Sequence, residues 1–380
     1  MTQCTTIGLI AAPELAEGIA KDLVDRLPKK LANKISNGTK WKIETVVDPL
    51  TGSAETIDEI FQAATSYRGH KTWDYIICLT DLPVFHGKKV VTVDINESLN
   101  ISLISIPAFG FRPVLNKVEK TVVYTFKEMH QRDDSLERKT EENVADKNAI
   151  KTTKLLRRSF PISPVRKIRL WMRETGDLHT RIFVTPKIYG KLRLLSGMTF
   201  ANNPFQMMSS LTHVVAIAFT TGAFAMIFPT MWKLSHIFSN GRLTAIMLAA
   251  VIGMVIWISI AHKLWEPLST SKEKHISRLY NLTTAMTLFI AILAYYVIVF
   301  LLFFSTSLIL IPSQFLSESL DLDVSISIVS YLKIAWFAAS LSIVSGAIGA
   351  GLANEELVRN STYGYRQQSR YEKVKELREK

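Results

Sequence analysis

The 380-residue chain is too long for one ordinary domain, and its overall figures, 48% hydrophobic residues and a net charge of +12, average over unlike parts. Its two cysteines, Cys4 and Cys78, exclude a disulfide framework and lack zinc-type spacing. The basic excess is concentrated in residues 151–205, which carry twelve basic and two acidic side chains. The first thirty residues show no charged start, apolar run and cleavage site of a secretory signal, so we expect a cytoplasmic N-terminus.

The first 130 residues alternate between strand-like and helix-like stretches. An apolar strand at the start leads through a turn into an amphipathic helix, and a second helix is expected over 53–68 with Ser53 as its cap. Further strands are predicted in 41–50, 73–84, 88–96 and 98–108, followed by a helix over 113–130. This order predicts a layered α/β domain in 1–130 with a mostly parallel sheet and a hairpin from Val90 to Ile106.

Four residues at predicted strand ends form a candidate ligand site. Pro13 follows the first strand, Asp48 the second, and Thr80 and Asp81 the third. In α/β sheets, ligands tend to bind beyond the carboxyl ends of the strands. The two aspartates could bind a cation or a ribose hydroxyl, or they could cap the turns that follow them. Both interpretations stay open at this point.

The sequence contains no motif for NAD, ATP or zinc. A phosphate loop with Lys and Ser/Thr is missing, and so is a Gly-x-Gly-x-x-Gly turn after the first strand. No His-Glu-x-x-His helix is present, since KTVVYTFKEMH offers only His130. We therefore predict no metal site, and the cofactor is unknown.

A charged segment and a basic segment follow the α/β region. Residues 131–164 are rich in charge and poor in apolar side chains, which indicates an exposed linker. Residues 165–205 predict a hairpin with its turn at 175–177, then a basic interfacial helix. We expect the anionic inner leaflet of a lipid bilayer as partner, rather than nucleic acid, because this segment directly precedes apolar spans. The membrane-surface candidates are Arg166, Lys167, Arg169, Lys187, Lys191 and Arg193.

Residues 206–353 predict an all-α transmembrane module. A helix needs about 20 apolar residues to cross a bilayer. Four segments meet this condition, at about 207–232, 243–265, 283–311 and 326–353. The loop between the second and third spans and the tail, 354–380, are basic, whereas PSQFLSESLDLDVS between the third and fourth has no basic residue. The positive-inside rule then predicts a multi-pass cell-membrane protein with both termini cytoplasmic.

Small residues recur along the fourth span. Ser342, Gly346 and Ala350 lie four residues apart, and Gly349 belongs to a parallel series. Such spacing allows close approach of two helix backbones in lipid. We expect close packing here, either within one chain or in a homo-oligomer.

An ordered set of motifs carries a family resemblance. The set is IGLIAAPELA, VVDPL, WDYIICLTDLP, SLISIPAFG and GKLRLLSGMTFANNP, followed by the four spans. It resembles an uncharacterised family of bacterial membrane proteins with an N-terminal cytosolic α/β domain. Some members carry the label 5,10-methylenetetrahydrofolate dehydrogenase, which the sequence does not support because the dinucleotide fingerprint is missing. The resemblance implies the architecture and no activity.

The leading hypothesis is a non-enzymatic membrane protein. In it, the cytosolic α/β domain binds a ligand or partner and biases the four-helix module. One alternative is an oligomeric channel or a transporter of small solutes or lipids. Another is a membrane-anchored enzyme acting through the α/β domain around Asp48 and Asp81.

Overall fold

The computed structural model describes residues 4–35, 40–54, 56–87, 89–111, 114–136, 153–156, 162, 164–171, 178–205, 212–266, 274–320, 326–350 and, in the tail, 359, 362, 365, 367, 369–372 and 375. Most of the predicted linker, the predicted hairpin turn at 175–177 and much of the tail therefore lie outside the described residues. The chain forms two compact units. An α/β unit comprises Met1–Ala201 with Arg366–Lys380, and a helical unit comprises Asn202–Tyr365.

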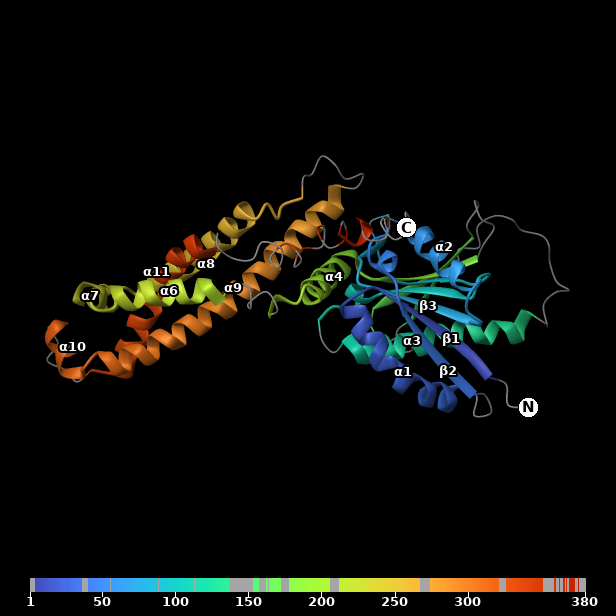
Figure 1. Ribbon diagram of the computed structural model, residues 1–380, viewed down its shortest axis with the longest axis horizontal. Helices are drawn as coiled ribbons and strands as arrows, with labels where there is room; N and C mark the ends of the chain where they lie inside the picture. Colours follow the sequence, from blue (N-terminus) through green and yellow to red (C-terminus); the bar gives the residue numbers. More distant parts are fainter. Residues whose placement is uncertain are drawn as a thin grey trace. The chain divides into compact units, whose positions relative to one another are not determined.

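The α/β unit is built on one sheet of nine described strands (Figure 1). Their order is β2-β1-β3-β6-β5-β9-β8-β7, with β4 paired to β5 outside this path. The strands are β1 (Cys4–Ala11), β2 (Lys40–Val47), β3 (Tyr75–Thr80), β4 (Val84–His86), β5 (Lys89–Asn96), β6 (Ile101–Ser105), β7 (Thr153–Leu156), β8 (Val165–Trp171) and β9 (Leu178–Val184).

The sheet is mixed, which corrects the expectation of a mostly parallel one. β1 runs parallel to β2 and β3, and β3 runs parallel to β6. The other pairs, β4–β5, β5–β6, β5–β9, β7–β8 and β8–β9, are antiparallel. The connection from β5 to β6 is too short for the crossover that parallel strands require, so these strands form the predicted hairpin. The hairpin predicted in the basic segment extends this antiparallel half as β8 and β9.

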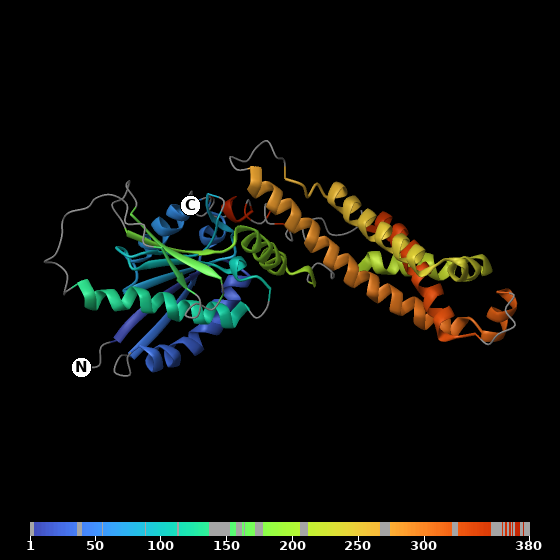
Figure 2. The same cartoon turned by 180° about the vertical axis from the view of Figure 1, so that it is seen from behind.

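Helices cover both faces of the sheet. α1 (Leu15–Lys34) and α3 (Val114–Leu136) lie on one face, and α2 (Ile57–Tyr67) lies on the other (Figures 1 and 2). The 3₁₀ turn η1 (Pro49–Gly52) follows Asp48 and uses residues that we expected to lead into α2. The helix therefore begins later than predicted, and its cap is Thr56, whose hydroxyl accepts from the Glu59 amide, rather than Ser53.

The helical unit contains long apolar helices. Within the described residues, three helices are long and apolar enough to cross a membrane, at Asn240–Ala261, Ile276–Leu310 and Ile328–Gly346. They belong to α8 (Asn240–Ala261), α9 (Lys274–Leu310) and α11 (Ile328–Ala350). α9 has 37 residues, so it is about 55 Å long and exceeds the hydrocarbon core of about 30 Å.

The first predicted span is divided into two helices. α6 (Thr212–Ala225) and α7 (Pro229–Ile237) meet at 94° and count as a fourth span only if they cross together. The break lies at Phe228 and Pro229, where proline occupies the first turn of α7 and the preceding residue is extended. A short helix, α10 (Ser313–Ser319), follows α9.

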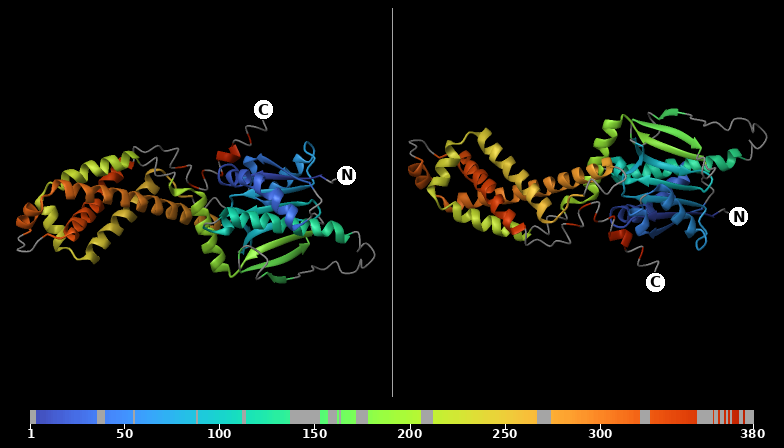
Figure 3. Two further views of the ribbon diagram at one scale, coloured as in Figure 1. Left: turned by 90° about the horizontal axis from the view of Figure 1, so that it is seen from below. Right: turned by 90° about the horizontal axis from the view of Figure 1, so that it is seen from above.

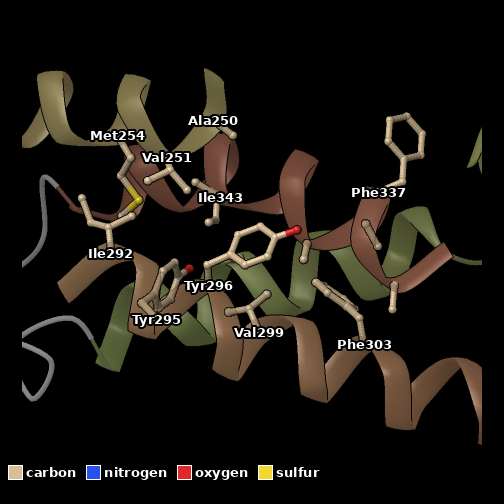
Figure 4. Close-up of a cluster of buried hydrophobic side chains, with 14 of the residues drawn as sticks. Ala250, Val251, Met254, Ile292, Tyr295, Tyr296, Val299, Phe303, Phe337 and Ile343 are labelled. Atoms are coloured by element: carbon tan, nitrogen blue, oxygen red, sulfur yellow. The ribbon is translucent and has the colours of Figure 1, made fainter. Parts of the chain in front are cut away.

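The helical unit has its own core (Figure 4). Tyr295 and Tyr296 project from α9 into it, and each hydroxyl has a hydrogen-bond partner. Tyr295 donates to the Val214 carbonyl of α6 at 3.1 Å, and Tyr296 donates to the Trp336 carbonyl of α11 at 3.2 Å. These bonds let two large side chains be buried without an unsatisfied hydroxyl, and they tie α9 to both neighbouring helices.

Candidate functional site

The candidate site lies at the carboxyl end of β3, where Asp81 binds the C-terminal tail. Arg370 donates from Nη1 to one Asp81 carboxylate oxygen at 2.8 Å and from Nη2 to the other at 3.1 Å. Both side chains are buried, with exposed fractions of 7% for Arg370 and 1% for Asp81. Figure 3 shows the red tail beside the blue elements of the α/β unit. A bidentate guanidinium–carboxylate pair of this kind is geometrically specific as well as strong.

Backbone carbonyls complete the guanidinium site. The Pro13 carbonyl, after β1, accepts from Arg370 Nη2 at 3.2 Å, and the Gly52 carbonyl, in η1, accepts from Nη1 at 3.2 Å. Gln367 adds a hydrogen bond from Nε2 to the Ser53 carbonyl at 3.2 Å. The groups turned toward the tail are therefore oxygen acceptors, which suit a cation rather than a phosphate.

The other two predicted ligand residues support the loops around this site. Asp48 accepts from the Leu50 amide at 2.9 Å and so caps η1, as the capping interpretation proposed. Thr80 donates from its hydroxyl to the Thr51 carbonyl at 2.6 Å. The structure thus brings Pro13, Asp48, Thr80 and Asp81 to one end of the parallel strands, where Pro13 and Asp81 contact Arg370 directly.

The backbone at Gly52 and at Glu14 has unusual properties next to Arg370. A Cβ on Gly52 would lie 2.3 Å from Arg370 Nη1, so the guanidinium occupies space that a larger residue at 52 would fill. Glu14, between β1 and α1, has φ 70°, a strained value for a residue with a side chain. Its carboxylate lies 3.7 Å from Arg370 Nη2 and adds negative charge at the rim.

Burial controls the titratable groups behind the site. Burial, followed by the charge of Asp48 and a hydrogen bond to it, raises the pKa of Tyr67 to about 12. Burial also raises the pKa of the Cys78 thiol. Both groups are therefore neutral at physiological pH, so Cys78 is a protonated thiol and a poor nucleophile.

The membrane-surface candidates fall on two different elements. Lys187, Lys191 and Arg193 lie on α4 (Lys187–Ala201), the helix expected in this segment. Arg166, Lys167 and Arg169 lie on β8, which belongs to the sheet. Strand alternation turns Lys167 toward α3, where it pairs with Glu128.

Two of the small residues of the last span, Gly346 and Ser342, pack within the chain. A Cβ on Gly346 would lie 3.2 Å from Val214 and Ala218 of α6, so the two helix backbones approach closely there. Ser342 of α11 is buried beside Gly222 of α6. Gly349 and Ala350 continue α11, but their surroundings lie outside the described residues.

A second charged cluster lies inside the sheet. Asp94 of β5 is opposite Arg181 of β9 in the antiparallel pair and accepts from its Nε at 2.6 Å. His179 lies 3.2 Å from the other Asp94 oxygen, and Arg181 reaches His86 at 2.8 Å. Burial and the neighbouring Arg181 lower the pKa of His86. The charge of the buried Asp94 carboxylate is thus compensated by Arg181 within the sheet. We interpret this cluster as a structural ion pair.

Sequence reasoning did not identify Arg370. The tail contains several basic residues, and only folding selects the one that reaches Asp81, 289 positions earlier in the chain. Among the residues that the structure describes, no three His, Cys, Asp or Glu side chains gather to hold a metal ion. Comparison with protein-family models, curated proteins and solved structures gives no match to this chain.

Proposed function

We propose that the protein is a non-enzymatic membrane regulator whose α/β unit holds the C-terminal tail through Arg370. The buried Asp81–Arg370 pair supports this proposal most directly. The tail follows α11 in the chain. In the proposed arrangement, occupancy of the strand-end site restrains the last apolar helix. A cytosolic ligand or partner that competes for the site would release the tail and alter the restraint on α11.

The energetics of the pair suit a two-state contact. Removing one partner of a buried ion pair costs about 3–5 kcal/mol, because the other charge is left without compensation. Release of the whole tail costs an amount near the lower end of this range, since water then reaches Asp81. A competing cation that restores the lost hydrogen bonds can therefore shift this equilibrium.

The same contact bears on membrane topology. The α/β unit precedes the apolar helices and the tail follows them, so their contact requires an even number of crossings between Ala201 and Arg366. α8, α9 and α11 are long and apolar enough to supply three. In the proposed arrangement the bent pair α6–α7 crosses as the fourth, and both termini lie on the cytoplasmic side.

Hydrogen exchange on the full-length protein in lipid nanodiscs tests the proposal. Arg370→Gln is compared with the parent chain and with Tyr371→Ser, a change at an exposed neighbour that leaves Arg370 in place. We expect Arg370→Gln alone to speed exchange in η1, in the residues after β1 and β3, and in the last turns of α11.

Two outcomes oppose the proposal in different ways. Unchanged exchange at the strand ends means that the tail is not held there in the membrane-embedded protein. Faster exchange at the strand ends with unchanged exchange in α11 means that the tail is anchored without any coupling to the helices.

A further inference from the structure

We propose that α4 rests the exposed apolar side of its first turns on the anionic lipid leaflet. The inference goes beyond tail binding and shares with it only the membrane location proposed above. α4 buries one side of its surface in the α/β unit and leaves the other side exposed.

One side of α4 is fixed to the α/β unit. Gly190, Leu194, Gly197 and Met198 are buried at helical spacing. A Cβ on Gly197 would lie 2.0 Å from the carbonyl oxygen of Pro107 in η2 (Ile106–Phe109), so only glycine permits this approach. The close contact fixes the rotation of α4 about its own axis and thereby decides which side chains face outward.

The outward side of the first turns is apolar. Ile188 is 76% exposed and Leu192 is 61% exposed. They are four residues apart, so they lie on the same side of the helix, almost opposite the buried stripe. Exposing two large aliphatic side chains to water is unfavourable in free energy, and insertion into a bilayer interface removes this exposure.

The charges beside this apolar side are basic. Lys187 and Lys191 are both exposed; Lys191 lies on the flank of Ile188 and Leu192, and Lys187 lies one turn before Lys191 at the start of the helix. Arg193, on the opposite flank, stacks over Tyr189 at 4.7 Å and donates to its hydroxyl at 2.9 Å. α4 carries no Asp or Glu. This combination fits an anionic lipid surface better than an apolar protein groove, which would have to desolvate the lysines.

The chain itself brings a membrane within reach. α4 ends at Ala201, and α6, the first helix of the apolar unit, begins at Thr212. Eleven residue steps span at most about 40 Å even when fully extended. α4 therefore stays within about 40 Å of the start of the first apolar helix, which favours lipid over a freely diffusing partner.

Fluorescence quenching in the full-length protein tests the proposal. In a Cys4→Ser chain, an environment-sensitive fluorophore is attached to Leu192→Cys, while Cys78 stays unlabelled because it is fully buried. The protein is reconstituted into vesicles of phosphatidylcholine alone or with phosphatidylglycerol, with bromine on the acyl chains. A label at Gly18→Cys, on an open part of α1, is the matched control.

We expect bromine to quench the label at 192 in the anionic vesicles and to leave the label at 18 unaffected. Lys187→Gln with Lys191→Gln should lower the docked-to-undocked ratio about 30-fold, since each base near an anionic surface contributes about fivefold. Equal quenching at 192 and 18 overturns the proposal. So does a blue shift at 192 without bromine quenching, which would mean that protein covers the face. Quenching should persist in Arg370→Gln, which separates this proposal from tail binding.

Discussion

The substitution Gly52→Ala should release the tail without removing any charged group. The added Cβ would lie 2.3 Å from Arg370 Nη1 and 3.1 Å from Cζ, well inside normal contact. It would also lie 3.0 Å from the Ala12 Cβ, a tighter fit that small shifts can relieve. Because the guanidinium is the far end of a flexible side chain, it should move out before the backbone of η1 does.

The size of the effect follows from the bonds that the movement breaks. Nη1 loses its hydrogen bonds to Asp81 at 2.8 Å and to Gly52 at 3.2 Å. Breaking a buried pair costs about 3–5 kcal/mol, and the value here should be near the lower end because water reaches Asp81 once the tail leaves. About 3 kcal/mol corresponds to a 100-fold or greater increase in the released population, by about tenfold per 1.4 kcal/mol.

Trypsin provides a direct assay, because it must bind the same arginine side chain that the site holds. Cleavage after Arg370 therefore requires release, and its rate follows the open population when opening is fast. Mass spectrometry of the full-length protein in detergent gives the rate at that bond. We expect cleavage to be about 100-fold faster in Gly52→Ala than in Gly18→Ala, whose added methyl group meets no neighbour within 4 Å. Equal cleavage rates in the two variants would mean that Gly52 does not keep Arg370 in place.

Three further predictions concern packing and ionisation. Gly222→Ala should destabilise the helical unit by about 1–3 kcal/mol in detergent unfolding, since its Cβ would meet the Phe303 ring at 2.2 Å and overpack the core. Gly197→Ala should cost the α/β unit at least as much in thermal unfolding, because the obstacle, Pro107, is backbone. Burial raises the pKa of Glu266, between α8 and α9, to about 7, so Glu266→Gln should raise the melting temperature above pH 7 and have no effect below about pH 4.5.

The controls for these predictions are specific. Gly253→Ala meets no neighbour within 4 Å, so it should match the parent protein or exceed its stability. An equal loss in Gly222→Ala and Gly253→Ala would contradict the packing argument. For Glu266, the carboxylate form is disfavoured in the folded state, so its penalty appears as pH rises from 4.5 to 7 and is constant above. A pH-independent effect of Glu266→Gln would contradict the raised pKa.

Most helices of the helical unit could be predicted, because long apolar stretches of sequence are enough to indicate where they lie. α8 and α11 lie close to the expected 243–265 and 326–353. α9 begins at Lys274 instead of Thr283, because polar residues can continue a helix beyond the length that a bilayer requires. The break before Pro229 was missed, although proline is a recognisable signal for it.

Pairings between strands and side chains that lie far apart in the sequence could not be predicted from local sequence patterns. The strands β8 and β9 were expected as a hairpin, but nothing in their residues shows that β9 pairs with β5 across the intervening linker. The strand ends of the candidate site could be located because parallel strands bring them together. The residue that occupies the site could not be predicted, since Arg370 is chemically equivalent to the other arginines of the tail.

Chemical crosslinking in intact membranes shows whether the C-terminal tail lies at the strand ends of the α/β unit. In a full-length Cys4→Ser chain, Glu14→Cys places an exposed thiol at the rim of the site, and Tyr371→Cys places another on the residue that follows Arg370. We predict that a short bifunctional thiol reagent joins them, and that adding Arg370→Gln abolishes the product. Absence of the crosslink while Arg370 is present, or reaction of the two cysteines with an impermeant reagent from opposite sides of the membrane, would contradict the account.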